Sequence, residues 1–225
     1  MDAQAPPGKV AFDIHEVFVR LRLACAALPK AAMFDLRDRG HGSPYEQLVS
    51  SLISARTLEH TTMAASLRLF AVARTPAEVA ALGHDGLLPL IRNATFPEAK
   101  ARDILALSRA ILDQHGGQVP DTMEGLTAFR GVGLKIAALT LAVGFGQPAI
   151  PVDIHVHRVA NRWGYVATAT PERTLAALQA KLPREYWIEI NERLVPFGKY
   201  ICTGPRPDCP DCPLLSMCRQ VGVAL

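Results

Sequence analysis

Apolar residues recur along the chain at intervals of three and four, which is the spacing of one face of an α-helix. Alternation of apolar and polar residues with a period of two, which would predict strands, is almost absent. The pattern therefore predicts an all-α protein of roughly ten helices. The apolar stripes comprise Ile14, Val17, Phe18, Leu21, Cys25 and Leu28; Ile104, Leu107 and Ile111; Leu175, Leu178 and Leu182; and Trp187, Ile190, Leu194 and Phe197.

Short polar signals mark where several of these helices begin. The segments from Ser43 to Glu46 and from Thr75 to Glu78 each combine an N-cap hydroxyl, a proline and the returning glutamate of a capping box. Asp121 with Glu124 predicts a third capped start. Thr170 precedes a proline and predicts a fourth.

The composition is that of a globular protein. The 225 residues are 49% hydrophobic and 20% charged, and 24 basic against 21 acidic residues give a net charge of +3. This charge permits an anionic partner without requiring one. The N-terminal stretch MDAQAPPGKVAFD lacks the apolar core of a secretion signal. The apolar run 136–146 is too short to span a bilayer, so we expect a soluble, cytoplasmic protein without membrane contact.

The five cysteines are distributed unevenly. Cys25 lies alone on a helical stripe, where a buried free thiol is expected. The other four have the spacing Cys-x6-Cys-x2-Cys-x5-Cys and are Cys202, Cys209, Cys212 and Cys218. Disulfides are disfavoured inside cells, so a common metal partner is expected. A structural zinc ion and a [4Fe-4S] cluster both take four thiolates.

Residues 127–144 read TAFRGVGLKIAALTLAVG and place Lys135 between a glycine-rich turn and a long apolar run. Gly131 and Gly133 would let the backbone approach a phosphate closely, because glycine has no Cβ. Amides at the start of the following helix would then point at the anion. The stretch fits neither the dinucleotide fingerprint nor the P-loop. Taken alone, it fits an ordinary turn between two helices equally well.

The combination and order of these features resemble the endonuclease III branch of the helix-hairpin-helix DNA glycosylases. The likeness rests on the Gly-x-Gly turn, a lysine two residues later, an aspartate eighteen residues after that lysine and the terminal cysteine spacing. It runs from about Ser43 to Cys218. The resemblance implies a bifunctional DNA glycosylase and abasic-site lyase of base excision repair. Such an enzyme would remove oxidised pyrimidines from double-stranded DNA, act as a monomer and associate with the nucleoid.

The resemblance also implies a fold and a cofactor. Two all-α domains would flank a DNA-binding cleft. Residues 37–147 would form a six-helix barrel with the helix-hairpin-helix, and residues 1–36 with 148–225 would form the iron–sulfur cluster domain. The family spacing favours the [4Fe-4S] cluster over zinc at the four cysteines, with a structural role.

Lys135 is, by this resemblance, the nucleophile. Its amine would attack C1′ of a flipped-out nucleotide, form a Schiff base and nick the strand by β-elimination. The amine must be neutral, whereas free lysine has a pKa near ~10.4. A pKa of about 8 would require roughly 3 kcal/mol. A helix N-terminus supplies only about 0.3–1 kcal/mol, so desolvation in the cleft is expected to supply the rest.

Asp153 follows Pro151-Val152 and precedes helical spacing, so the residues alone predict an N-cap. The resemblance adds that its carboxylate stabilises positive charge developing on the sugar and assists Lys135. His155 matches the family pattern in a supporting role. His157 is expected to pack against neighbours or to lie on the surface.

The chain departs from the family pattern at three places that would contact DNA. The family's Leu-Pro-Gly-Val-Gly-Arg-Lys-Thr-Ala reads Phe-Arg-Gly-Val-Gly-Leu-Lys-Ile-Ala at 129–137, which predicts altered DNA affinity with unchanged chemistry. Arg56 replaces the glutamine that fills the gap left by the flipped base. Phe96 occupies the position of the leucine wedge. The alternatives for these two residues are a surface arginine and a core phenylalanine.

Two other functions share part of this pattern. An adenine-mismatch glycosylase has the hairpin, the aspartate and the cluster, but generally lacks this lysine and carries a further C-terminal domain. A non-catalytic DNA-binding module would retain only the phosphate clamp. The presence of both Lys135 and Asp153, and a chain that ends seven residues after Cys218, favour the lyase.

Overall fold

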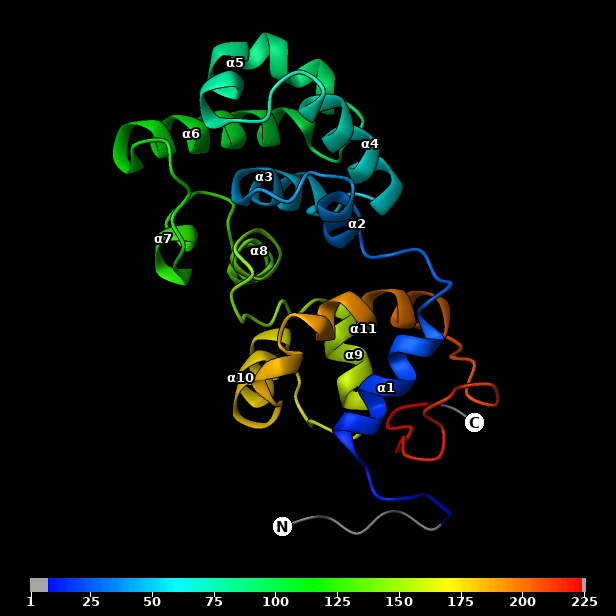
Figure 1. Cartoon of the computed structure of the whole chain (residues 1–225). Helices are drawn as coiled ribbons and strands as arrows, with labels where there is room; N and C mark the ends of the chain where they lie inside the picture. Colours follow the sequence, from blue (N-terminus) through cyan, green and yellow to red (C-terminus); the bar gives the residue numbers. More distant parts are fainter. Residues whose placement is uncertain (1–7, 224–225) are drawn as a thin grey trace. The chain divides into compact units, whose positions relative to one another are not determined.

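The computed structural model describes residues 8–223, and these residues form helices and connecting loops without any strand (Figure 1). The all-α prediction is confirmed. The elements are α1 (Ile14–Ala24), α2 (Ala32–Asp38), α3 (Pro44–Ser54), α4 (Glu59–Phe70), α5 (Pro76–Ile91), α6 (Pro97–His115), α7 (Met123–Thr127), α8 (Leu134–Leu139), the π-helical segment η1 (Thr140–Gly144), α9 (Ile154–Arg162), α10 (Pro171–Lys181), the 3-10 turn η2 (Arg184–Tyr186) and α11 (Glu189–Tyr200). Residues 1–7, part of the stretch considered for a secretion signal, lie outside the described residues.

The chain divides into two compact units. One spans Ala32–Pro151 and contains α2 to α8 with η1, and we call it the hairpin unit. The other joins α1 to the residues from Val152 onward, and we call it the cysteine unit. The divisions fall after residues 31 and 151, close to the predicted 36 and 147. The identity of the units as barrel and cluster domains stays a prediction. None of the helices within 8–223 has the length and apolarity needed to cross a bilayer.

The capped helix starts form largely as the sequence predicts. Ser43 and Thr75 each accept the amide of the glutamate three residues on, and Glu46 and Glu78 return the bond to the cap residue. Thr170 caps α10 in the same way, without a returning glutamate. Local polar patterns were sufficient here because every partner lies within one helical turn.

Two predicted helix starts are displaced. Asp121 is not the cap of α7, because Thr122 accepts the amide of Gly125 in its place. Both residue types can cap a helix, and the chain path selects the one whose oxygen reaches a free amide. The apolar stripe that begins at Trp187 also starts outside its helix, since Trp187 ends the turn η2 and α11 begins at Glu189.

The hairpin unit is organised around α3. Residues 45–53 of this helix are all buried, and the helix packs against α4, α8 and η1. Helices α5 and α6 lie side by side, and α7 and α8 form the two arms of the helical hairpin (Figure 1). A Cβ on Gly144 would lie 2.8 Å from the Cα of Pro44, so η1 and α3 meet at a distance that only glycine allows.

The cysteine unit is organised around α9. This helix packs against α10 and α11, and α11 packs in turn against α1. Cys25 is buried at the end of α1, where its thiol lies 3.5 Å from the carbonyl oxygen of Arg193. Burial raises the pKa of the Cys25 thiol to about 11, which fits the predicted buried free thiol.

Candidate functional site

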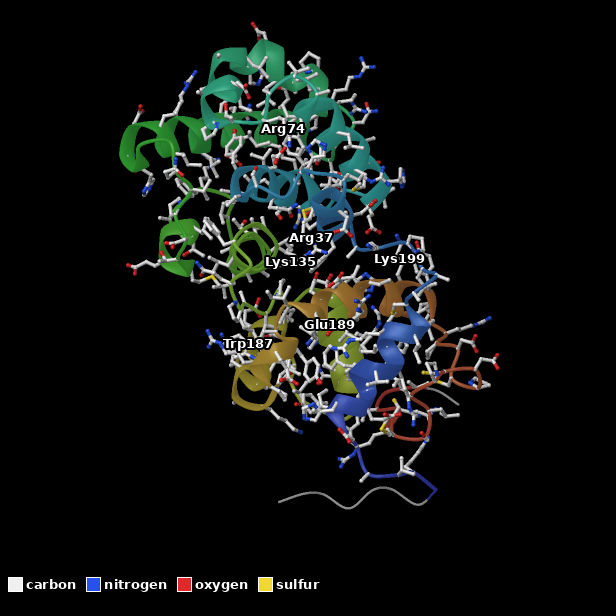
Figure 2. All side chains as sticks on the ribbon, viewed as in Figure 1. Arg37, Arg74, Lys135, Trp187, Glu189 and Lys199 are labelled. Atoms are coloured by element: carbon white, nitrogen blue, oxygen red, sulfur yellow. The ribbon has the colours of Figure 1, made fainter. Side chains whose placement is uncertain are left out.

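Lys135 is the second residue of α8 and directly follows the glycine-rich turn (Figure 2). Its side chain is exposed and, within the described residues, makes no hydrogen bond or ion pair. The preceding Leu134 is also 45% exposed although it is apolar. Beyond Lys135 the helix is buried and continues into the π-helical η1, a form that is frequent at functional sites. A free amine therefore projects from a firmly packed helix.

The two glycines of the turn are required for different reasons. Gly131 has a φ of +82°, which favours glycine, and it lies against Leu52 and Asp103. Gly133 is the N-cap of α8 with φ −92° and ψ 177°, a conformation open to any residue. A Cβ on Gly133 would meet no atom within 4 Å. The protein's own structure thus explains Gly131 but gives no reason for glycine at position 133.

Arg130, which replaces the family's proline, pairs with an acidic residue of α6. Its Nε lies 3.2 Å from Oδ1 of Asp103, the residue that also lies beside Gly131. The arginine side chain is 87% exposed, so the pair contributes at most about 1 kcal/mol to stability. The pair nevertheless joins the hairpin turn to α6 and neutralises the added positive charge.

Arg56 and Phe96 share an uncommon backbone conformation. Their φ angles are +57° and +56°, in the left-handed region that side chains disfavour. Phe96 is 59% exposed, so the alternative of a core phenylalanine is wrong. Arg56 is exposed and has no partner among the described residues. Such strain costs about 1–3 kcal/mol and tends to occur at functional sites.

Hydrogen bonds join the loop of Arg56 to the loop of Phe96. The Oγ1 of Thr57 accepts the amide of Thr95 at 3.0 Å and the ammonium of Lys100 at 2.7 Å. Lys100 also donates to the carbonyls of Ile53 at 2.5 Å and Ala55 at 2.7 Å. Its side chain is buried, and burial lowers the pKa of Lys100 to about 8. The sequence analysis did not identify this lysine.

Three α-helices of the hairpin unit have an N-cap residue whose side chain makes no capping hydrogen bond. These residues are Leu58 before α4, Phe96 before α6 and Gly133 before α8. Leu58 is 68% exposed and lies two residues after Arg56. An uncapped start leaves amides of the first turn without a partner. Each of these starts therefore coincides with, or lies beside, a residue predicted to contact DNA.

Asp153 is the N-cap of α9, as the sequence predicts. Its Oδ1 accepts the amides of His155 and Val156, both at 2.9 Å, and its side chain is half-buried. His157 pairs with Thr174 at 2.6 Å, which fits the expected packing role. Asp153 belongs to the cysteine unit, whereas Lys135, the two glycines, Arg56 and Phe96 all belong to the hairpin unit.

The four clustered cysteines line one common pocket in the cysteine unit. Its wall is mostly apolar and includes Trp163, Phe197 and Leu215. Among the described residues, no three histidine, cysteine or acidic side chains converge closely enough to hold a single metal ion. Burial raises the pKa of Cys212 to about 11 and also raises that of Cys218. The four thiols therefore lie around one common pocket.

Two arginines of α9 hold the backbone that carries the first cysteine. Arg158 donates to the carbonyls of Gly198 at 2.5 Å and Cys202 at 3.1 Å. Arg162 is buried, donates to the carbonyls of Thr203 and Gly204, and lies 3.5 Å from the sulfur of Cys202. The helix that begins at Asp153 thus ends at the cysteine loop.

Comparison with known proteins gives one consistent result. Residues 49–184 match the model of the HhH-GPD superfamily base excision DNA repair proteins. The chain is 42% identical to endonuclease III of Thermotoga maritima over 183 residues, which cover 81% of this chain and 86% of that protein. It is 34% identical to endonuclease III of Escherichia coli over 177 residues, covering 79% and 84%.

Solved structures of the same type superpose on this one. A trapped covalent intermediate of endonuclease III with DNA matches with a TM-score of 0.78 and 31% identity, over 92% of this chain and 94% of that chain. A non-covalent complex of endonuclease III with DNA matches with a TM-score of 0.80 and 30% identity over the same shares.

Proposed function

The chain belongs to the endonuclease III family of base excision DNA repair proteins and is a DNA glycosylase with lyase activity, and on this premise we propose that Lys135 is its nucleophile. We also propose that its substrates are oxidised pyrimidines and abasic sites in duplex DNA. The observation that carries the proposal is a free, exposed amine beside a glycine whose presence the fold does not explain.

The start of α8 is suited to a DNA phosphate. No side chain caps this helix, so its first amides are available to an anion, and the positive end of the helix dipole attracts one. A Cβ at position 133 would extend into open space, and glycine leaves this space free for the approach of a phosphate. This contact would position the duplex without reading its sequence.

Lys135 would then carry out two steps. Its unprotonated amine forms a bond to C1′ of the extruded nucleotide as the bond to the base breaks, and ring opening leaves an iminium. Loss of a proton from C2′ expels the 3′ phosphate and nicks the strand. Because Lys135 is exposed in the protein alone, the bound duplex would enclose its amine beside the extruded nucleotide.

Asp153 would stabilise the positive charge on the sugar. Only Oδ1 takes the two capping bonds, which leaves Oδ2 for the substrate. Arg56 and Phe96 would enter the duplex, with Phe96 filling the stack and Arg56 meeting the base left opposite the gap. The exposure of both side chains supports these roles.

The four cysteines fit a [4Fe-4S] cluster better than a single zinc ion. Structural zinc sites usually combine two Cys-x2-Cys pairs that lie far apart in the sequence, whereas these four cysteines include one such pair within a single short loop. A cluster takes one thiolate at each iron, and its sulfurs accept N–H bonds such as that of Gln220 to Cys218 at 3.3 Å. The cluster would tie together a loop that has little core of its own.

Metal analysis would test the cofactor. Protein prepared without oxygen should be brown and contain about four irons and four sulfides per chain. Cys212→Ser should lose the colour and most of the iron, whereas Cys25→Ser should keep both, because Cys25 lies at the end of α1 away from the cavity lining. Stoichiometric zinc in place of iron would contradict the assignment.

Covalent trapping would test the nucleophile. Wild-type protein incubated with an abasic duplex and borohydride should yield a reduced adduct, and peptide mapping should place the DNA remnant on Lys135. Lys135→Ala should give no adduct and no nicking, yet retain most of its affinity for the duplex, because the proposed phosphate contact comes from backbone amides. An adduct on another residue would overturn the assignment.

A further inference from the structure

Lys100 contacts both loops that carry strained residues. Through its backbone, its amide donates to the carbonyl of Phe96 at 3.1 Å and closes the first turn of α6. Through its ammonium, it binds the carbonyls of Ile53 and Ala55 at the end of α3, on either side of Ser54. One residue therefore joins the start of α6 to the segment that leads into Arg56.

The hydrogen-bonding capacity at this junction is fully used. The three N–H groups of the Lys100 ammonium meet three acceptors: two carbonyls and the hydroxyl of Thr57. The Thr57 oxygen accepts from Lys100 and from the amide of Thr95, which lies next to Phe96, and it lies 3.5 Å from the carbonyl of Ala55. A neutral or shorter side chain at position 100 would leave buried acceptors unpaired.

The ammonium also lies where a cation is favourable. The carbonyls of Ile53 and Ala55 belong to the C-terminal end of α3, where carbonyl groups lack helical partners and the dipole is negative. This attraction offsets part of the cost of burying a charge. A buried lysine that caps one helix from the first turns of another is therefore a stable link between them.

We propose that Lys100 and Thr57 are positioning residues that hold the Arg56 and Phe96 loops in one register for entry into DNA. The inference rests on the proposed function only in assigning DNA as the ligand of the two loops. Arg56 and Phe96 have left-handed backbone conformations, which a chain does not favour unless other residues hold it there. The Lys100–Thr57 junction supplies the constraint, so that both side chains are presented together before DNA arrives.

The junction should affect base excision and strand nicking to different extents. Extrusion of a paired nucleotide needs a wedge and a gap-filling group at the same step, because unstacking and unpairing cost a few kcal/mol. An abasic site has already lost the base, so its nicking needs less help from the loops. Loosening the junction should therefore slow base excision from a paired lesion more than nicking of a preformed abasic site.

The test uses Thr57→Val, which removes the hydroxyl at nearly constant shape, with Thr57→Ser as the conservative variant. Thr62→Val is a matched control, because the Thr62 hydroxyl bonds only the carbonyl of Leu58 one turn earlier. Lys100→Met removes the whole junction. For each variant, two single-turnover rate constants are measured: excision of an oxidised pyrimidine paired with guanine, and nicking of an abasic duplex. The ratio of excision to nicking is then compared with that of the wild type.

Thr57→Val should lower this ratio about tenfold, the equivalent of one positioning hydrogen bond at about 1.4 kcal/mol. Thr57→Ser and Thr62→Val should stay within about twofold of the wild-type ratio. Lys100→Met should lower the ratio at least as much as Thr57→Val, and Phe96→Ala should do the same if the wedge is correctly placed. Equal loss of both rates, or no change in the ratio, would overturn the inference.

Hydrogen–deuterium exchange in the absence of DNA separates this inference from the proposed function. Thr57→Val should speed exchange in residues 92–96 although the substitution lies in the other loop, because the Thr95 amide loses its acceptor. Thr57→Ser should not. Unchanged exchange in residues 92–96 would show that the loops are not coupled, whatever the enzyme does. Coupled exchange in a protein without excision activity would instead count against the proposed function alone.

Discussion

Six α-helix starts of the hairpin unit, those of α3 to α8, fall into two groups that differ in how their first amides are satisfied; at α2 the amide of Ala32 donates to Glu59 of α4. At α3, α5 and α7 a serine or threonine of the chain accepts an amide of the first turn. At α4, α6 and α8 no side chain does so, and the cap positions are leucine, phenylalanine and glycine. Both groups occur in one compact unit, so the difference does not reflect a general lack of polar residues.

This difference separates structural helix ends from ends available to a ligand. A capped start has at least one of its first amides satisfied within the protein and gains about 1 kcal/mol from the cap. An uncapped start retains unpaired amides and the full positive end of the dipole, which are the elements of an anion site. The uncapped starts lie at or beside Arg56, Phe96 and Lys135, the residues proposed to act on DNA.

The two groups were not equally predictable from sequence. The capping boxes at Ser43 and Thr75 could be predicted because their partners lie three residues away. The left-handed conformations of Arg56 and Phe96 could not, because the groups that hold them come from other helices. Lys100 did leave a signal: it lies four residues before Ile104, on the apolar stripe of α6, where a lysine needs buried acceptors.

The candidate site residues were identified from the sequence, whereas the contacts that hold them in place were not. Lys135, Asp153 and the cysteines follow from local motifs, and the structure shows the predicted N-cap at Asp153. The arginines Arg158 and Arg162 carry no motif, since their partners are carbonyls more than thirty residues away along the chain. Every residue has a backbone carbonyl, so the sequence does not show which one accepts a hydrogen bond, and such contacts can be identified only from a structure.

The largest expected effect concerns a capped start that also has a chemical role. Asp153→Asn should preserve the fold, because asparagine can accept the same two amides, yet slow nicking by about 10²-fold or more through loss of the negative charge. Asp13→Asn is the matched control, since Asp13 caps α1 in the same unit. Single-turnover rates and thermal midpoints should be measured for both. Nicking by Asp153→Asn at the wild-type rate would remove Asp153 from the chemistry.

A second prediction concerns the acidic residue of the α3 capping box. Burial, the largest influence on Glu46, raises its pKa, but hydrogen bonds from Ser43, Arg74 and His41 together hold it below its ordinary value. Arg74, labelled in Figure 2, donates through Nε at 2.8 Å. A carboxyl with a lowered folded pKa stabilises the protein above its unfolded pKa, near ~4.3, and loses that contribution as pH falls through the folded pKa.

Glu46→Gln should therefore lower the free energy of unfolding by about 2 kcal/mol at pH 7, the scale of a charge-assisted hydrogen bond. The difference from wild type should shrink as the pH falls below ~4.3, where the unfolded chain takes up a proton at this carboxyl, and should be lost only below the lower pKa of the folded state. Denaturant unfolding at several pH values measures this difference. A gap that stays constant down to pH 3 would mean that the charge of Glu46 contributes nothing.

The substitution with the smallest expected effect tests the two groups of helix starts most directly, because it turns an uncapped start into a capped one. Gly133→Asp would supply α8 with the cap it lacks, at a position whose backbone any residue can adopt and where a Cβ meets no atom. The thermal midpoint should rise slightly, since aspartate exceeds glycine as a cap by a few tenths of a kcal/mol. The same carboxylate would occupy the amides and repel a phosphate. Affinity for a duplex with a stable abasic-site analogue should therefore fall about tenfold, or about 1.4 kcal/mol.

Thr75→Asp provides the matched control for this substitution. It adds the same charge at the start of α5, where the existing cap is already satisfied within the chain. Its DNA affinity should stay within about twofold of wild type at physiological salt, because a charge far from the bound phosphate is screened over about 8 Å. If Gly133→Asp and Thr75→Asp weaken binding equally, the loss comes from net charge, and the start of α8 is not a phosphate site. If only Gly133→Asp weakens binding while stability rises, the free amides at the start of α8 bind a DNA phosphate.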